Sequence, residues 1–310
     1  MPEKQLEFIE QTPSGIEVLY QAEPKRLYKV RRPYSKGNAV VVVYPGEWLE
    51  VPSVTTVLDV LNKAGLPWWG QGIGVEGVQK LHNLGLLRTA YMPNGNAVLT
   101  IEQEGQWVVA GKELIVDLLT RTKLTVNHIR DDAGTRGNNV HTALEQWAED
   151  GILPDPSLYP PEEQGYVQGL LQFLEHVQPE VVGSEVMVGS LEHGFAGRYD
   201  LDFKLDEERT VVFHRTPKRG PQWATLPPGL YKADLKTSSG VYFSHFKQLA
   251  GYEIAAVECG HPATDGQGVI HVNADGTYEF VRSIAVADDF LTTLAEWRSQ
   301  EAMKERRRSK

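Results

Sequence analysis

Hydrophobic and polar positions follow two different periods along this chain of 310 residues. In the first 52 residues, apolar or alternating runs such as 16–20 and 39–43 are separated by Pro-Ser-Gly and Ser-Lys-Gly-Asn turns, which predicts short strands. Further along, Val140, Leu144 and Trp147 recur at intervals of four and three residues, which predicts a helix with one buried face. The chain is therefore expected to begin with strands and to continue with longer helices.

After residue 180 the pattern predicts strands interleaved with helices. The expected helices cover residues 51–61, 74–84, 112–124, 134–151, 161–177, 241–258 and 288–308, with a hairpin or loop over 91–111. The expected strands of the later part cover residues 184–188, 197–203, 210–213, 230–238 and 268–272, with a basic, proline-rich insert before the strand at 230. This order predicts an α/β fold, with a mixed central β-sheet flanked by helices over residues 131–310 and an N-terminal β-rich and helical extension over residues 1–130.

Composition limits the classes of protein that fit. Apolar residues make up 41% of the chain and charged residues 23%, as in ordinary globular proteins, and no apolar run approaches the roughly 20 residues that span a membrane. The first residues carry no secretory signal, and a single cysteine excludes an internal disulfide and a four-cysteine iron–sulfur cluster within one chain. These features predict a cytoplasmic protein without a membrane partner.

The net charge of −10 argues against a protein that coats nucleic acid by bulk electrostatics, but positive charge is concentrated locally. Residues 24–38 hold six basic side chains, no acid, and two interleaved tyrosines. A solvated face and a contact surface for single-stranded nucleic acid explain this cluster equally well. The basic residues that we consider as nucleic-acid contacts are Lys25, Arg26, Lys29, Arg31 and Arg32.

An acid and a base lie close together on the expected strand at 230–238. Asp234 and Lys236 are two residues apart and therefore project from the same face, while Leu235 faces the other way. Asp200 is a second carboxylate, on the strand expected before this one. Carboxylate oxygens are the ligands that Mg²⁺ prefers, and an imidazole from His141 would favour Mn²⁺ somewhat more. Together these residues predict a metal-dependent site that hydrolyses phosphodiesters.

The order of these residues resembles a known nuclease family. In chain order the set is Gly-x-x-x-His141, Glu185, Gly-x-x-Asp200, Asp234-x-Lys236 and Gln248-x-x-x-Tyr252. This set resembles the RecB-like branch of the PD-(D/E)XK nucleases over residues 51–258. The segment that begins at Pro52 and reads Pro-Ser-Val-Thr-Thr-Val-Leu, followed by Trp68 and Trp69, is similar to phage exonucleases of this branch and to the mitochondrial genome maintenance exonucleases.

The resemblance implies a restriction-endonuclease-like core and a role for each matching residue. It implies metal ligation by His141, Asp200, Asp234 and the backbone carbonyl of Leu235, and catalysis by Lys236. Glu185 would support the site, Gln248 and Tyr252 would position the lysine or the nucleic-acid backbone, and Asp202 is expected in solvent or behind the ligands. The residues of the N-terminal motif that we consider as nucleic-acid contacts are Ser53, Thr55 and Trp69.

The sequence thus predicts a Mg²⁺- or Mn²⁺-dependent deoxyribonuclease without an iron–sulfur cluster. An exonuclease that acts on single-stranded DNA or free ends is the preferred mode, and the resemblance suggests recombination or repair in a bacterium or a phage-infected cell. A recombination protein or a single-strand-binding protein is an expected partner. Two alternatives stay open: a structure-specific or restriction-type endonuclease, and a non-catalytic nucleic-acid-binding module of the same fold.

Overall fold

The computed structural model describes residues 7–22, 27–31, 48–61, 66–216, 218 and 220–308. Contacts divide the chain into two compact units, of which the first comprises residues 1–61 and 137–310 and the second residues 62–136. The first 61 residues therefore group with the later part of the chain, whereas the sequence pattern suggested one N-terminal extension that ends near residue 130. None of the helices in the described ranges is both long and apolar enough to cross a membrane.

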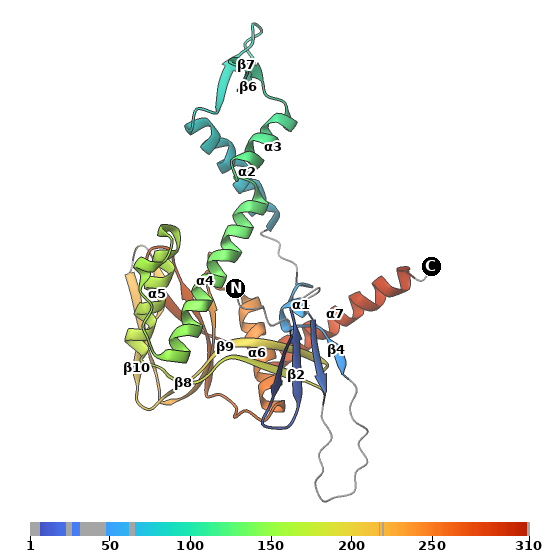
Figure 1. Ribbon diagram of the computed structural model, residues 1–310, viewed down its shortest axis with the longest axis vertical. Helices are drawn as coiled ribbons and strands as arrows, with labels where there is room; N and C mark the ends of the chain where they lie inside the picture. The colour runs from blue at the N-terminus through green and yellow to red at the C-terminus, as the bar shows by residue number, and fades with distance from the viewer. Residues whose placement is uncertain are drawn as a thin grey trace, which may run out of the picture. The chain divides into compact units, whose positions relative to one another are not determined.

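A mixed five-stranded sheet forms the centre of the first unit (Figure 1). Its order is β14-β13-β12-β9-β8, and the β12–β13 pair is parallel while the other neighbours are antiparallel. The strands are β8 (Glu180–Ser190), β9 (Phe195–Leu205), β12 (Gly229–Lys236), β13 (Gly266–Val272) and β14 (Tyr278–Arg282). The mixed α/β class is thereby confirmed.

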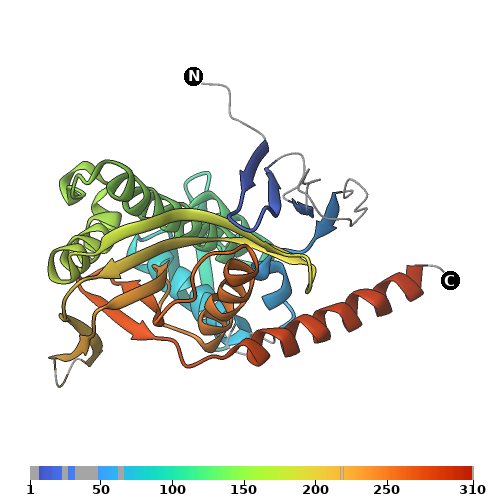
Figure 2. The ribbon, with the colours of Figure 1, turned by 90° about the horizontal axis from the view of Figure 1, so that it is seen from below.

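Helices cover both faces of this sheet (Figure 2). On one face, α5 (Pro161–Val177) and the C-terminal part of α4 (Val126–Asp150) bury Val140, Leu144 and Trp147. On the other face lie α6 (Phe243–Glu258) and α7 (Ala287–Arg308), together with the short α1 (Val54–Leu58). The two faces bury separate hydrophobic clusters, which we call the α4–α5 core and the α6 core.

Two smaller sheets complete the first unit. The N-terminal sheet is antiparallel in the order β1 (Glu7–Gln11), β2 (Glu17–Gln21), β3 (Leu27–Arg31) and β4 (Leu49–Val51), and it packs Val18 and Val30 into the α6 core. The segment expected as a strand over residues 39–43 lies outside the described residues. The basic insert forms a hairpin of β10 (Arg209–Thr216) and β11 (Gly220–Leu226), and a 3-10 helix (Pro156–Leu158) precedes α5.

The second unit has a core of its own. Helices α2 (Leu66–Asn83) and α3 (Lys112–Arg121) and a three-stranded sheet surround Leu81, Leu87 and Ile101. The strands are β5 (Leu87–Tyr91), β6 (Ala97–Gln103) and β7 (Gln106–Val109). The segment 91–111, expected as a hairpin or loop, contains the β6–β7 hairpin. Strand β5, which precedes it, adds a third antiparallel strand, and Leu87 and Ile101 of this sheet enter the core of the unit.

Candidate active site

The predicted catalytic residues lie where the central sheet passes from one hydrophobic core to the other. On β9, Tyr199 belongs to the α6 core and Leu201 to the α4–α5 core, so that Asp200 lies at the boundary. On β8, Val186 belongs to the α6 core, and Glu185 immediately precedes it. Polar side chains at this boundary escape complete enclosure by either core, which is the physical condition for an open polar site.

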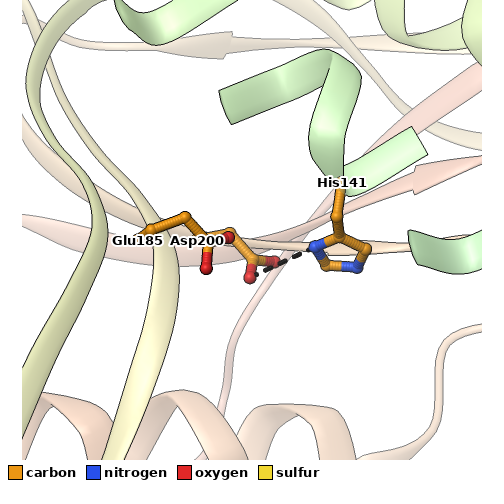
Figure 3. Close-up of side chains that lie close together, drawn as sticks. All are labelled: His141, Glu185 and Asp200. Atoms are coloured by element: carbon orange, nitrogen blue, oxygen red, sulfur yellow. Dashed lines mark ion pairs between the residues drawn. The ribbon is translucent and has the colours of Figure 1, made fainter. Parts of the chain in front are cut away.

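His141, Glu185 and Asp200 form a compact group (Figure 3). Each offers one ligand atom, and these atoms all lie within 4.8 Å of one another. The imidazole descends from α4 toward the Asp200 carboxylate, with Nδ1 3.3 Å from Oδ1, and the Glu185 carboxylate lies beside them (Figure 3). One imidazole nitrogen and two carboxylates at this spacing fit a divalent cation, whose ligand atoms lie about 2.0–2.2 Å from the metal.

Glu185 adopts an unusual backbone conformation. Its φ is 52°, in the left-handed region that residues with a β-carbon rarely adopt inside a strand. It lies between the pairs Ser184–Leu201 and Val186–Tyr199 of the β8–β9 ladder, and therefore opposite Asp200. Such a conformation costs on the order of 1–3 kcal/mol and is concentrated at functional sites.

Asp234 and Lys236 project from β12 beside this group. Their side chains form a buried ion pair between the Lys236 Nζ and the Asp234 Oδ2. The β9–β12 ladder reaches Ala233–Leu201, and beyond it the backbone N–H of Leu235 donates to the Asp200 Oδ2 at 2.6 Å. Asp200 thus takes the place of a backbone acceptor where the two strands reach the site, which fixes its carboxylate relative to Asp234.

The site is a cluster of opposed charges in a poorly solvated place. Burial alone would raise the pKa of Asp200, but His141, Lys236 and the Leu235 N–H outweigh it and hold this pKa below its ordinary value. Burial, with repulsion from Asp200, raises the pKa of Glu185 to about 7 although Arg198 opposes the rise. Burial lowers the pKa of Lys236, but Asp234 and Asp200 more than offset that effect and raise it. Asp200 and Lys236 are accordingly charged at neutral pH.

A cleft of about 1100 Å³ within the first unit surrounds these groups. It is bordered by the N-terminal sheet, α1, α4, α6 and α7 as well as by β9 and β12. The sequence-predicted residues that line it are Ser53, Thr55, His141, Glu185, Asp200, Asp234, Lys236, Gln248 and Tyr252. Residues that are up to 199 positions apart in the sequence, from Ser53 to Tyr252, therefore share one cavity.

Gln248 and Tyr252 form one unit on α6. The Gln248 Nε2 donates to the Tyr252 hydroxyl at 2.8 Å, as expected for side chains four residues apart on a helix. The Tyr252 ring lies against the backbone of Gly197, where an added β-carbon would stand 2.6 Å from the ring. Gly197 therefore permits the close approach of α6 to β9 that brings this pair to the cleft.

The N-terminal motif contributes hydroxyl groups. Ser53 is the N-cap of α1, and its Oγ accepts from the Thr56 N–H at 3.0 Å. The hydroxyls of Thr55 and Ser53 lie 2.9 Å apart at the cleft. Trp69 belongs to α2 in the second unit, and its side chain lies outside the described residues.

The predicted basic contacts are only partly within the described chain. Lys25, Arg26 and Arg32 lie outside the described residues. Lys29 lies on β3 opposite Glu50. Arg31 forms an ion pair with Glu17 at 2.6 Å and places its guanidinium 4.2 Å from the centre of the Trp48 ring. Arg31 is thus already engaged by neighbours within the N-terminal sheet.

Several lining residues were not singled out from the sequence. Arg198 pairs with Glu185 at 2.7 Å, and Tyr20 and Trp297 contribute rings to the cleft. Arg198 stands inside the Gly-Arg-Tyr-Asp motif that ends at Asp200, so its position next to a ligand was available as a signal. Tyr20 and Trp297 carried no such signal, whereas Tyr28, which also lines the cleft, is one of the two tyrosines noted among the basic residues of 24–38.

Asp202 lies behind the site and is buried. Its carboxylate accepts from the Lys232 Nζ at 2.8 and 3.1 Å and from the Tyr199 hydroxyl at 2.5 Å. Lys232 is completely buried, and its ammonium stands 3.3 Å from the centre of the Tyr199 ring. This second acid–lysine pair lies on the same two strands as the candidate site but is not among the residues that line the cleft. Of the two places expected for Asp202, in solvent or behind the ligands, its burial excludes the first.

His271 anchors the loop that follows Lys236. It pairs with Lys236 in the β12–β13 register, its Nε2 lies 2.7 Å from the Ser238 carbonyl, and its Nδ1 lies 3.3 Å from Glu279. Both partners only accept hydrogen bonds, so both contacts are hydrogen bonds only when the imidazole is doubly protonated. Burial lowers the pKa of His271, but Glu279 and the Ser238 carbonyl outweigh it and raise the pKa. The pKa of Glu279 is lowered, chiefly by the hydrogen bond from His271.

We expect His271→Gln to lower the free energy of unfolding by about 1.5–3 kcal/mol at pH 6 and by much less at pH 9. A raised histidine pKa stabilises the fold below its ordinary value of 6.5 and loses that effect as pH rises through the folded-state value. The Glu279 contribution is present above its ordinary value of 4.5 and is lost as pH falls through its lowered folded-state value. Between pH 6 and pH 9 only the His271 contribution changes, and urea unfolding of the variant and the wild type at these two pH values measures it. Equal losses at pH 6 and pH 9 would contradict a charged His271.

Comparison with protein-family models finds no match for this chain, and comparison with curated proteins finds none either.

Proposed function

We propose that this protein is a metal-dependent deoxyribonuclease that hydrolyses phosphodiester bonds from the ends of single-stranded DNA. One observation carries the proposal: the Asp234–Lys236 ion pair stands in the same cleft as the His141–Glu185–Asp200 group. Carboxylates that fit a divalent cation, with a lysine beside them, supply the Lewis acid and the positive charge that promote phosphodiester hydrolysis. We also propose that the core of the first unit is restriction-endonuclease-like and that the protein is related to the RecB-like nucleases.

The proposed cation lies between His141, Glu185 and Asp200. When bound, Mg²⁺ or Mn²⁺ would polarise the scissile phosphate and lower the pKa of a bound water. Glu185 thereby becomes a ligand rather than only a supporting residue, whereas Asp234 stands next to this group and contacts Lys236. Arg198 shares the Glu185 carboxylate, so it orients that ligand and reduces its charge.

The side chains of the cleft would act on the substrate directly. Lys236 would hold its positive charge beside the attacking water and the phosphate, because Asp234 and Asp200 keep it protonated. Asp234 would orient the ammonium through the ion pair. Tyr252 and Gln248 would donate to phosphate oxygens from α6, and the Ser53 and Thr55 hydroxyls would do so from α1.

Removal of the metal tests this proposal. We expect the purified protein to shorten linear, end-labelled single-stranded DNA in Mg²⁺ or Mn²⁺ and to stop when EDTA is added, because carboxylates and an imidazole alone cannot neutralise the charge of the transition state. Denaturing gels with the label at either end in turn would follow the reaction. Asp200→Asn should abolish cleavage and weaken Mn²⁺ binding measured by titration calorimetry.

Three results would decide against parts of the proposal. No cleavage of any DNA with either metal would favour a binding module of the same fold. Cleavage of circular single-stranded DNA as fast as of linear DNA would favour an endonuclease. Cleavage that persists in EDTA would exclude the proposed role of the cation.

A further inference from the structure

Three aromatic rings form a row across one face of the N-terminal sheet. Phe8 on β1 pairs with Tyr20 on β2, and Tyr20 pairs with Tyr28 on β3. Residues that pair directly in a ladder project from the same face, and the ring centres are 6.4 Å and 5.0 Å apart. We call Phe8, Tyr20 and Tyr28 the aromatic row.

The row begins in the cleft and continues outward. Tyr20 and Tyr28 are half-buried and line the cleft, whereas Phe8 is 41% exposed and lies on the outer strand. Val18 and Val30, two residues away on the same strands, enter the α6 core. Tyr20 and Tyr28 pack against the border of this core and also line the cleft, so part of each ring is in the packing and part faces the cleft.

Arg198 connects the row with the candidate metal site. Its guanidinium lies 5.9 Å from the centre of the Tyr20 ring and pairs with Glu185 at 2.7 Å. A DNA strand with its scissile phosphate at the His141–Glu185–Asp200 group would thus have its neighbouring nucleotides beside the aromatic row. Tyr20 and Tyr28 are thus rings of the cleft wall that could hold bases.

The charge of the cleft favours such a contact. Among the described residues that line it, carboxylates outnumber permanent cations, which are Arg198 and Lys236. The carboxylates are Glu50, Glu145, Glu185, Asp200, Asp234, Glu301 and Glu305. One divalent cation offsets only part of this charge, so attraction of phosphates is a weak anchor here. Stacking of bases on rings does not depend on the charge of the wall.

We propose that the aromatic row is a base-stacking subsite for single-stranded DNA, so that the enzyme selects strands with unpaired bases. The nature of the ligand rests on the proposed nuclease function. In a duplex the faces of the bases are stacked on the neighbouring base pairs. Only a single strand presents base faces to Tyr20 and Tyr28. In this proposal the selection of single strands depends on Tyr20 and Tyr28.

Binding of strands with and without bases tests the subsite. Fluorescence anisotropy would compare a labelled oligothymidylate with an abasic strand of the same length and charge, in Ca²⁺ instead of Mg²⁺, with a gel to verify that both stay intact. We expect the wild-type protein to bind the oligothymidylate about tenfold or more tightly than the abasic strand. The double variant Tyr20→Leu/Tyr28→Leu should lose this preference and bind both strands equally weakly.

Two control variants separate stacking from packing. Tyr20→Phe/Tyr28→Phe keeps both rings and should retain the preference. Trp223→Leu removes a half-exposed ring on β11 outside the cleft and should change nothing. If the leucine variant does not fold, the comparison of the two strands on the wild-type protein still decides the question.

Equal binding of the two strands by the wild-type protein would overturn the subsite. So would an equal loss of affinity for both strands in the folded leucine variant. A wild-type protein that cleaves DNA but ignores the bases would leave the nuclease function standing. A protein that prefers base-bearing strands but never cleaves would support the subsite and refute the nuclease.

Discussion

Lys236→Met is expected to lower the rate of DNA cleavage about a thousandfold or more while leaving the fold intact. Methionine fills a similar volume but removes the charge that would stand beside the attacking water and the phosphate. The ion pair with Asp234 is lost in this variant. Burial already raises the pKa of Asp234, so its carboxyl can take up a proton once the Lys236 ammonium is removed. Single-turnover cleavage of end-labelled DNA measures the rate, and circular dichroism measures the fold.

Metal binding distinguishes a lost catalytic charge from a lost site. His141, Glu185 and Asp200 remain in Lys236→Met, so Mn²⁺ should still bind when it is titrated in a calorimeter. A variant that binds Mn²⁺ and is folded but inactive agrees with the proposed role of Lys236. A variant that cleaves at the wild-type rate would remove Lys236 from the mechanism.

Lys232→Met is expected to produce the opposite result: a loss of about 3–5 kcal/mol in the free energy of unfolding, with cleavage by the folded fraction unchanged. Lys232 lies on the same face of the same strand as Lys236, but its ammonium is completely buried and holds the Asp202 carboxylate. Removal of the lysine leaves a buried carboxylate without its counter-charge, which water cannot compensate. Urea unfolding curves give the loss, provided that the slopes of variant and wild type agree.

The matching double variant tests the cause of that loss. Replacement of both partners, Lys232→Met with Asp202→Leu, removes the unpaired charge and should recover part of the stability. If the double variant were as unstable as the sum of the two single variants, the pair would not interact energetically. If Lys232→Met were stable but inactive, Lys232 would belong to the catalytic site.

Local periodicity predicted several elements closely. Helix α5 begins at Pro161, as expected from the proline at its first position, and ends at Val177. Helix α1 lies inside the expected range 51–61, with Ser53 as its N-cap. Elements that depend on partners were predicted less well: α4 begins at Val126 rather than at residue 134, and β14 (Tyr278–Arg282) was not expected. A short edge strand such as β14 is decided by pairing with β13, which periodicity does not record.

The candidate site also combines locally predictable features with features that depend on pairing between elements. Asp234 and Lys236 share a face because side chains on a strand repeat every two residues. Gln248 and Tyr252 share a face because side chains on a helix repeat every 3.6 residues. The β8–β9 register that brings Glu185 opposite Asp200 connects residues that no local pattern relates. The resemblance to a nuclease family gathered these residues in order, but it did not include Arg198 or the aromatic row.

Side-chain spacing within single elements was enough to predict the mixed α/β class, most of the helices, and the shared face of the acid and the lysine on β12. The packing of whole elements determines how far each acid–lysine pair is enclosed. Asp202 on β9 pairs with Lys232 on the neighbouring strand β12, whereas Asp234 and Lys236 pair within β12, two residues apart. The first pair is enclosed, and the second reaches the boundary between the two cores, because burial depends on which elements pack over a strand and not on the strand alone.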